Sequence, residues 1–260
     1  MKHAWRSQVW ALALNVFREA IRDKMLQVLI GAGMLLLLFS LVLGEMAVGS
    51  SERVVQNMGF WLLGMWGLIA VLYMGSNIVR NEIQRHTVYL ILSRPVNRTT
   101  FLLGKFCGML LVLLSGFVLL SVVWLLLMVG TGIPVTAFHL LALMYIGGEW
   151  ALMAAFSLFF ASFTSPMLHN LFLVGITFLG HWSNDLKLFA ANAREVWLQY
   201  LLKSLYYMLP NLEALNFREA ALYNVPVSSA LLFEGALVLA GWIGAALIAA
   251  NLIFSRRRLL

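Results

Sequence analysis

Charged residues are scarce in this sequence. Asp, Glu, Lys and Arg make up only 11% of its 260 residues, whereas hydrophobic residues make up 62% and the mean hydropathy is +0.89. A water-soluble domain carries roughly 25% charged residues. So much apolar surface cannot be hidden in one globular core, but a lipid bilayer accepts it. The composition therefore excludes a water-soluble protein and predicts an integral membrane protein.

Cysteine is almost absent as well, and so are the motifs of several enzyme classes. The single cysteine, Cys107, excludes an intramolecular disulfide and a multi-cysteine metal site, and we interpret it as a packing residue. Gly104-Lys105 resembles the end of a phosphate-binding loop, but Thr99 and Phe106 stand where that motif needs glycine and Ser or Thr. The histidines have no metal-site spacing, and no G-x-S-x-G sequence occurs.

These absences predict that the chain holds no catalytic residue, no bound cofactor and no metal. An intramembrane enzyme stays as an alternative. It would need a nucleophile and a base at the same depth in the membrane, and we find no sequence spacing that supplies such a pair.

Six stretches are long and apolar enough to cross about 30 Å of hydrocarbon as helices. They cover residues 25–44, 58–79, 103–130, 137–161, 167–184 and 229–254. The turn at residues 162–166 is short, so the fourth and fifth spans should form an antiparallel hairpin. Helices are expected because lipid cannot satisfy the open edges of a sheet. The predicted fold class is an all-α polytopic membrane protein, with residues 1–260 in one domain.

The positions of Lys and Arg predict the orientation of these spans. With the N-terminus inside, thirteen of the eighteen basic residues fall on inner segments. The inner ones are Lys2, Arg6, Arg18, Arg22, Lys24, Arg80, Arg85, Arg94, Arg98, Lys105, Arg256, Arg257 and Arg258. The outer ones are Arg53, Lys187, Arg194, Lys203 and Arg218. We therefore expect both termini in the cytoplasm of a bacterium and the chain in its inner membrane. The net charge of +7 reflects this asymmetry and implies no nucleic-acid partner.

Three parts of the chain outside the spans carry further structure, and a basic cytoplasmic tail follows at 255–260. Within residues 1–24, polar side chains recur at helical spacing from 5 to 23, which predicts an amphipathic helix at the inner interface. An inner loop runs from residue 80 to about 102. The outer segment 185–228 should hold one or two short helices on the outer face, broken by Pro210 and Pro226.

The inner loop alternates apolar and charged residues between Arg80 and Arg98. This pattern predicts a short amphipathic helix at 82–92, and Pro95 should turn the chain after it. Such a helix, parallel to the membrane, suits the docking of a soluble partner. The charge pattern alone fits an ordinary solvated loop as well.

Part of this loop resembles the inner-loop signature of ABC-2 type permeases, the membrane subunits of ATP-driven transporters. The matching residues are Glu82, Thr87, the run Leu92-Ser93-Arg94-Pro95-Val96-Asn97-Arg98, and Leu103-Gly104-Lys105-Phe106. The resemblance extends to the layout of the whole chain, from the N-terminal interfacial helix to the long outer segment before the last span. His86 stands where many members have glycine, and Asn97 where serine is frequent.

The resemblance implies a permease subunit that exports an unidentified substrate and is not itself an enzyme. It would pair with a second permease copy, in a homodimer or heterodimer, and with two ATP-binding subunits that hold ATP and Mg²⁺. Segment 82–92 would be the coupling helix that receives the movement of the ATPases. The implied coupling residues are Glu82, Arg85, His86, Thr87, Leu92, Arg94, Pro95 and Arg98. A membrane assembly or scaffold protein with the same fold stays as an alternative.

Two carboxylates lie inside predicted spans, Glu149 in the fourth and Glu234 in the sixth. A carboxyl group at this depth costs several kcal/mol unless it is protonated, paired or hydrated, so both are candidate functional residues. The alternative for each is a hydrogen bond to a neighbouring helix. Because Gly147 and Gly148 precede Glu149, we expect a polar contact across a helix or dimer seam. His181, at the end of the fifth span, is expected to be structural.

Overall fold

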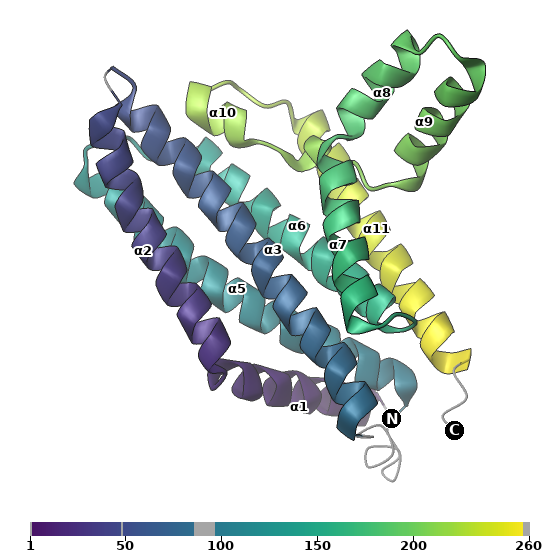
Figure 1. Ribbon diagram of the computed structural model, residues 1–260. Coiled ribbons are helices and arrows are strands. Elements are labelled where there is room, and N and C mark those ends of the chain that lie inside the picture. Colours follow the sequence, from purple (N-terminus) through teal and green to yellow (C-terminus); the bar gives the residue numbers. More distant parts are fainter. Residues whose placement is uncertain (1, 48, 86–96, 257–260) are drawn as a thin grey trace.

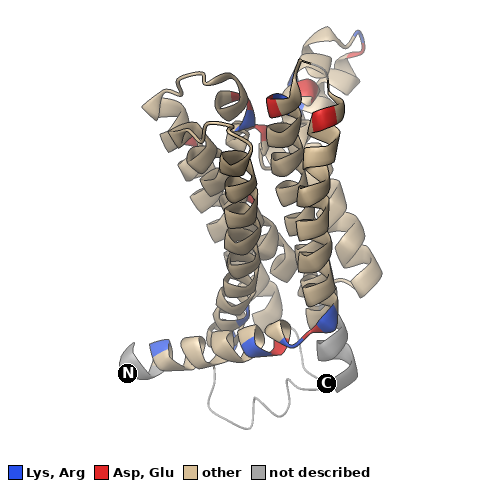
Figure 2. Ribbon diagram, turned by 90° about the vertical axis from the view of Figure 1, so that its left-hand side faces the viewer, with Lys and Arg blue, Asp and Glu red and all other residues tan. Residues whose placement is uncertain are grey.

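The computed structural model describes residues 2–47, 49–85 and 97–256, and every regular element in these ranges is helical. Five helices are long and apolar enough to cross a membrane. They are α2 (Lys24–Met46), α3 (Ser51–Arg85), α5 (Arg98–Gly130), α6 (Ala137–Ala161) and α11 (Ser229–Arg256). The helices form one bundle (Figure 1), and charged residues gather toward its two ends (Figure 2). The predicted all-helical, multi-pass architecture is therefore confirmed.

Helix α1 (Lys2–Ile21) lies across one end of the bundle instead of running along it (Figure 2). It packs on α5, where two glycines let the helix backbones approach. A Cβ added at Gly104 would lie 2.6 Å from Leu12, and one at Gly108 would lie 2.6 Å from Val16. The helix predicted at residues 5–23 is thus present, and its apolar side is held by α5.

The elbow between α1 and α2 is fixed by one side chain. Asp23 is the N-cap of α2, and its carboxylate accepts a hydrogen bond of 2.8 Å from the Met25 N–H. The second carboxylate oxygen accepts a hydrogen bond of 2.7 Å from the Tyr73 hydroxyl of α3. The direction of α2 relative to α1 is therefore set by capping and by a contact to a third helix.

Helix α3 is the central helix, in contact with α2, α5, α6 and α7 (Figure 1). Three glycines spaced eight residues apart on α3 accept large side chains from its neighbours. A Cβ at Gly59 would overlap Trp124 of α5, and a Cβ at Gly67 would overlap Trp150 of α6. A Cβ at Gly75 would overlap side chains of both α6 and α7. These glycines make close packing possible and position three helices around α3.

The helix ends differ from the sequence prediction at the inner loop. The second span was expected to end at residue 79, but α3 continues without a break to Arg85. The third was expected to begin at 103, but α5 begins at Arg98, after Asn97 in an extended N-cap conformation. The expected loop 80–102 was therefore too long, because charged residues end an apolar run without ending a helix. The fourth span, 137–161, coincides with α6.

The fifth predicted span, 167–184, divides into two helices. Helix α7 (Pro166–His181) has sixteen residues and therefore reaches only about 24 Å. It begins with proline at its first turn, where the missing N–H costs nothing. The chain bends at Trp182, and α8 (Ser183–Asn192) continues in a new direction. As predicted, α7 follows a short turn and packs on α6.

The outer segment holds more helical elements than the one or two expected. After α8 come α9 (Val196–Met208), the 3₁₀ turn η1 (Glu213–Leu215) and α10 (Arg218–Tyr223). Pro210 follows the end of α9 and Pro226 follows α10, so both prolines do separate helices. Helices α8 and α9 form a hairpin that projects from the bundle, whereas α10 lies against α3 and α6 (Figure 1).

Candidate functional site

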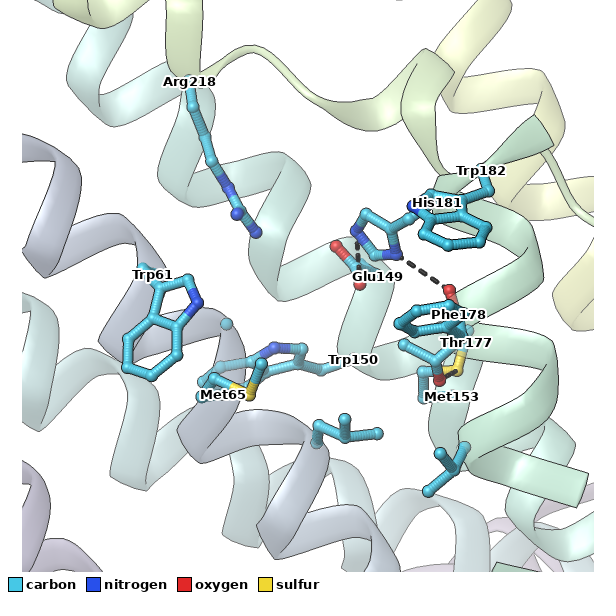
Figure 3. Close-up of a pocket in the computed structure, with 13 residues that line it drawn as sticks. Trp61, Met65, Glu149, Trp150, Met153, Thr177, Phe178, His181, Trp182 and Arg218 are labelled. Atoms are coloured by element: carbon cyan, nitrogen blue, oxygen red, sulfur yellow. Dashed lines mark hydrogen bonds and ion pairs between the residues drawn. The ribbon is translucent and has the colours of Figure 1, made fainter. Parts of the chain in front are cut away.

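A cavity of about 230 Å³ lies between α3, α6, α7 and the start of α10 (Figure 3). Six of its thirteen lining residues are tryptophan, phenylalanine or methionine. These residues are Trp61, Met65, Trp150, Met153, Phe178 and Trp182. The charged and titratable groups are Glu149, His181 and Arg218, which come from three different elements. An apolar cavity with a few convergent polar groups is the usual form of a small-molecule binding site.

Glu149 contacts His181 across the seam between α6 and α7. Its Oε1 lies 3.4 Å from His181 Nε2, and 12% of the Glu149 side chain is exposed. His181 Nδ1 lies 3.0 Å from the Thr177 carbonyl oxygen (Figure 3). A carbonyl oxygen only accepts, so Nδ1 carries a hydrogen. The polar contact expected for Glu149 is therefore present, and its partner is a residue that the sequence analysis treated as an interfacial cap.

This geometry requires a proton between the carboxyl group and the imidazole. With Nδ1 protonated, a neutral ring would turn the Nε2 lone pair toward a carboxylate oxygen, which is repulsive. The contact is attractive when the ring is an imidazolium or when the carboxyl is protonated. Either form keeps the pair electrically neutral inside the bundle, where an unpaired charge is costly.

Arg218 brings a fixed positive charge to the same cavity. Its guanidinium extends from α10 toward Glu149 (Figure 3). The space for it is made by Gly64 of α3, because a Cβ there would lie 3.0 Å from Arg218 Nη2. Arginine keeps its proton at any physiological pH. The cavity therefore holds one permanent cation beside a carboxyl–imidazole pair.

The outer segment positions both His181 and Arg218. The Leu212 N–H donates to the Gly180 carbonyl oxygen at 3.1 Å, which satisfies a carbonyl at the end of α7. The Ser183 hydroxyl donates to the Asn211 side-chain oxygen at 2.6 Å. The chain after Pro210 is thus held against the end of α7, and η1 leads from there into α10. Contacts distant in sequence therefore end α7 at the cavity and direct Arg218 into it.

The second predicted intramembrane carboxylate, Glu234, lies elsewhere. Its side chain is exposed on α11 and lines a separate pocket of about 480 Å³ under the outer segment. Glu213 and Glu219 line the same pocket. Among the described residues no group of His, Cys, Asp or Glu could hold a metal ion. The structure therefore does not bring Glu234 together with Glu149.

The predicted coupling residues are only partly described. Glu82 and Arg85 lie in the last turn of α3, so residues 82–85 continue that helix and do not begin a separate one, because nothing in their sequence ends it. The other expected coupling residues, except Arg98, lie outside the described residues: His86, Thr87, Leu92, Arg94 and Pro95.

Arg98, the first residue of α5, binds the end of α11. Its Nη1 donates to the carbonyl oxygens of Phe254 at 3.0 Å and Ser255 at 2.7 Å. Next to it, the Thr99 hydroxyl donates to the Asn251 side-chain oxygen at 3.0 Å. The last carbonyls of a helix have no partner within the helix and carry its negative dipole end. Arg98 therefore caps α11 and joins it to α5.

One expectation about enzyme chemistry is wrong. The fold does bring a nucleophile and a base together, because Ser157 Oγ of α6 lies 3.0 Å from His169 Nε2 of α7. His169 Nδ1 lies 3.0 Å from the Asn170 side-chain oxygen, and the Ser76 hydroxyl of α3 donates to the same oxygen at 2.7 Å. Ser157 and His169 are both 0% exposed. Both side chains are closed off from the surface, and the network joins three helices.

No family model matches the sequence, and no curated protein matches it. Function must therefore be argued from the motif in the inner loop and from the geometry of the cavity. His181 could have been predicted from the sequence as the partner of Glu149, because the two residues lie at comparable distances from the turn at 162–165. Nothing comparable in the sequence indicates that Arg218 lies at this cavity.

Proposed function

We propose that this chain is the membrane-spanning permease subunit of an ATP-driven exporter of the ABC-2 type. In this proposal the chain crosses the inner membrane of a bacterium six times. Helix α7 is the short fifth crossing, α1 lies at the cytoplasmic interface, and both termini are cytoplasmic. Two copies, identical or different, bind two separate ATPase subunits, which hold ATP and Mg²⁺. The ATPases supply the energy, and this chain forms the path that the substrate takes across the membrane.

The observation that carries the proposal is the way the inner end of the bundle is joined together. The segment with the permease signature connects α3 to α5. Helix α5 is packed on α1 through Gly104 and Gly108, and Arg98 joins it to the end of α11. A push on this segment would therefore act on α1, α3, α5 and α11 together. An ordinary solvated loop has no need of such an attachment.

The cavity at Glu149 fits the substrate path of this proposal. Its aromatic and methionine wall suits an amphipathic molecule, and Arg218 and the Glu149–His181 pair offer groups of both charges. Trp150 lies in this wall and also contacts Phe117 of α5, with 4.7 Å between the ring centroids. Movement of α5 would therefore change the shape of the cavity.

Co-purification of the ATPase subunit with charge-reversed variants tests the proposal. Glu82→Lys and Arg85→Glu should keep membrane insertion, because both lie beyond the apolar part of α3. ATPase recovery should fall, since like-charge contacts at a docking rim cost several kcal/mol. Lys203→Glu, on the exposed face of α9, is the matched control and should leave recovery unchanged.

Substrate-dependent ATP hydrolysis and ATP-driven movement in vesicles complete this test. Normal recovery and normal coupled hydrolysis with both inner variants would show that the loop is only a connector. Binding of the ATPase without any ATP-driven movement of solute would instead support the assembly or scaffold protein.

A further inference from the structure

A third cavity, of about 300 Å³, lies at the opposite end of the bundle, where α1, α2, α3 and α5 meet. Figure 2 shows that charged residues gather where α1 meets α2. One part of the cavity wall is apolar and comes from Val16, Ala20, Leu26, Met74 and Ile78. The other part is polar and comes from Glu19, Asp23, Tyr73, Asn77 and Lys105. The cavity is therefore amphipathic.

The polar groups place opposite charges on different elements. Glu19 lies in the last turn of α1 and Asp23 is the N-cap of α2, and both residues line the cavity near the junction of these helices. Asp23 is held in place by Tyr73 and by the N–H that it caps. Lys105 approaches from α5, with its Nζ 4.5 Å from the centroid of the Phe101 ring. The cavity thus has two carboxylates near the elbow, an ammonium on α5 and the Asn77 amide on α3.

We infer that this cavity binds the headgroup of a phospholipid that carries a primary amine, such as phosphatidylethanolamine. The lipid ammonium lies between the carboxylates of Glu19 and Asp23, and its phosphate faces Lys105 and the Asn77 amide. The apolar wall takes the start of the acyl chains. Helix α1 is amphipathic and lies across the ends of the spans, which is the depth at which lipid headgroups are found.

The charges on the wall select among lipids. Two carboxylates against one ammonium disfavour an anionic headgroup, which brings no positive charge to Glu19 and Asp23. A choline headgroup brings the charge but has no N–H to donate to a carboxylate, whereas a primary ammonium has three. Charge-assisted hydrogen bonds are the stronger ones. A free phosphate ion would face one cation, Lys105, and two carboxylates.

Binding of short-chain lipids to the purified, delipidated protein tests this inference. Dioctanoyl phosphatidylethanolamine, phosphatidylcholine and phosphatidylglycerol are added separately, together with inorganic phosphate as a fourth ligand. Native mass spectrometry counts bound molecules, and tryptophan fluorescence follows the thermal unfolding midpoint. The ethanolamine lipid should bind about tenfold more tightly than the other lipids, and inorganic phosphate should not raise the midpoint.

Two acid-to-amide variants make the test specific. Glu19→Gln removes one carboxylate from the cavity and should weaken binding of the ethanolamine lipid about tenfold, with a smaller loss for the choline lipid, which has no N–H to donate to that carboxylate. Glu19 is exposed, so this variant should unfold at the wild-type temperature without lipid. Glu234→Gln, an exposed acid in the other pocket, is the matched control and should keep the lipid preference.

Equal binding of the three lipids would overturn the inference, and so would an unchanged preference in Glu19→Gln. Preference for phosphatidylglycerol or for inorganic phosphate would show an anion site at Lys105 instead. Neither readout involves the ATPase, so this test and the test of the permease function fail independently.

Discussion

The packing of α3 can be tested by adding one methyl group at Gly67. A Cβ at this position overlaps the indole of Trp150. The indole cannot easily move away, because Trp150 is only 2% exposed and contacts Trp66 and Phe117, with ring-centroid distances of 5.3 Å and 4.7 Å. Adding a methyl group to a close-packed interior costs typically about 1–3 kcal/mol. Replacing glycine by alanine inside a helix returns up to about 1 kcal/mol.

Because the new methyl group overlaps a ring that has little room to move, its cost lies at the upper end of this range, and Gly67→Ala should lower the free energy of unfolding by about 2 kcal/mol. For a chain near this size, that loss lowers the unfolding midpoint by about 4–8 °C. Tryptophan fluorescence or loss of the monodisperse peak after heating, in one detergent, measures the midpoint. Gly31→Ala on α2 is the matched control, because a Cβ there meets nothing within 4 Å. It should melt at or slightly above the wild-type temperature.

A double variant separates this overlap from a general effect on α3. Trp150→Phe removes the part of the indole that meets the new methyl group, so Gly67→Ala should cost less in that background than in the wild type. If Gly67→Ala melts at or above the wild-type temperature, the close approach of α3 and α6 is refuted. Equal costs of Gly67→Ala in both backgrounds would refute the assignment to Trp150.

Three further predictions concern charged residues. Glu149→Leu leaves His181 Nε2 without a partner and should lower the free energy of unfolding by about 1–3 kcal/mol. The amide of Glu149→Gln can still donate to that nitrogen, so this variant should melt closer to the wild-type temperature. Arg98→Gln should lower the free energy of unfolding by about 1 kcal/mol, and Arg98→Lys by less, because lysine keeps a positive charge at the end of α11. Thermal unfolding of the two variants measures both losses. Single cysteines at Lys187 and Arg22, in a Cys107→Ala background, test the orientation of the chain. An impermeant thiol reagent added to intact cells should label only position 187. Labelling at position 22 would show that the predicted orientation is wrong.

Hydropathy and length predicted the long helices but not all of their ends. Residues 137–161 agree with α6 at both ends because Thr136 forms a capping box with His139 and the apolar run stops at the following turn. The end of α3 was missed because Arg80, Glu82 and Arg85 leave the membrane but favour a helix as much as their neighbours do. The sequence therefore predicted where the apolar part of α3 ends but not where the helix itself ends.

The candidate site was only half predictable from the sequence. Glu149 could be selected because a carboxyl inside an apolar run is costly and needs a partner. Its surroundings depend on tertiary contacts that local sequence does not encode. The bend at Trp182 follows from the hydrogen bond between Leu212 and Gly180, and Arg218 enters the cavity only because α10 lies against α3. An ordinary outer arginine in the sequence is thus a cavity residue in the fold.

The two ends of the molecule are built for different tasks. At the α1 end, Asp23 joins the junction of α1 and α2 to α3, and Arg98 joins α5 to α11. At the other end, α7 stops early, and α10 lies against α3 and α6 with its arginine at the cavity. Trp150 lies between these regions, in contact with α3 and α5 and in the wall of the cavity. In the proposed permease, a displacement that begins at the α1 end would act on the cavity through Trp150, which is buried and has little room to move.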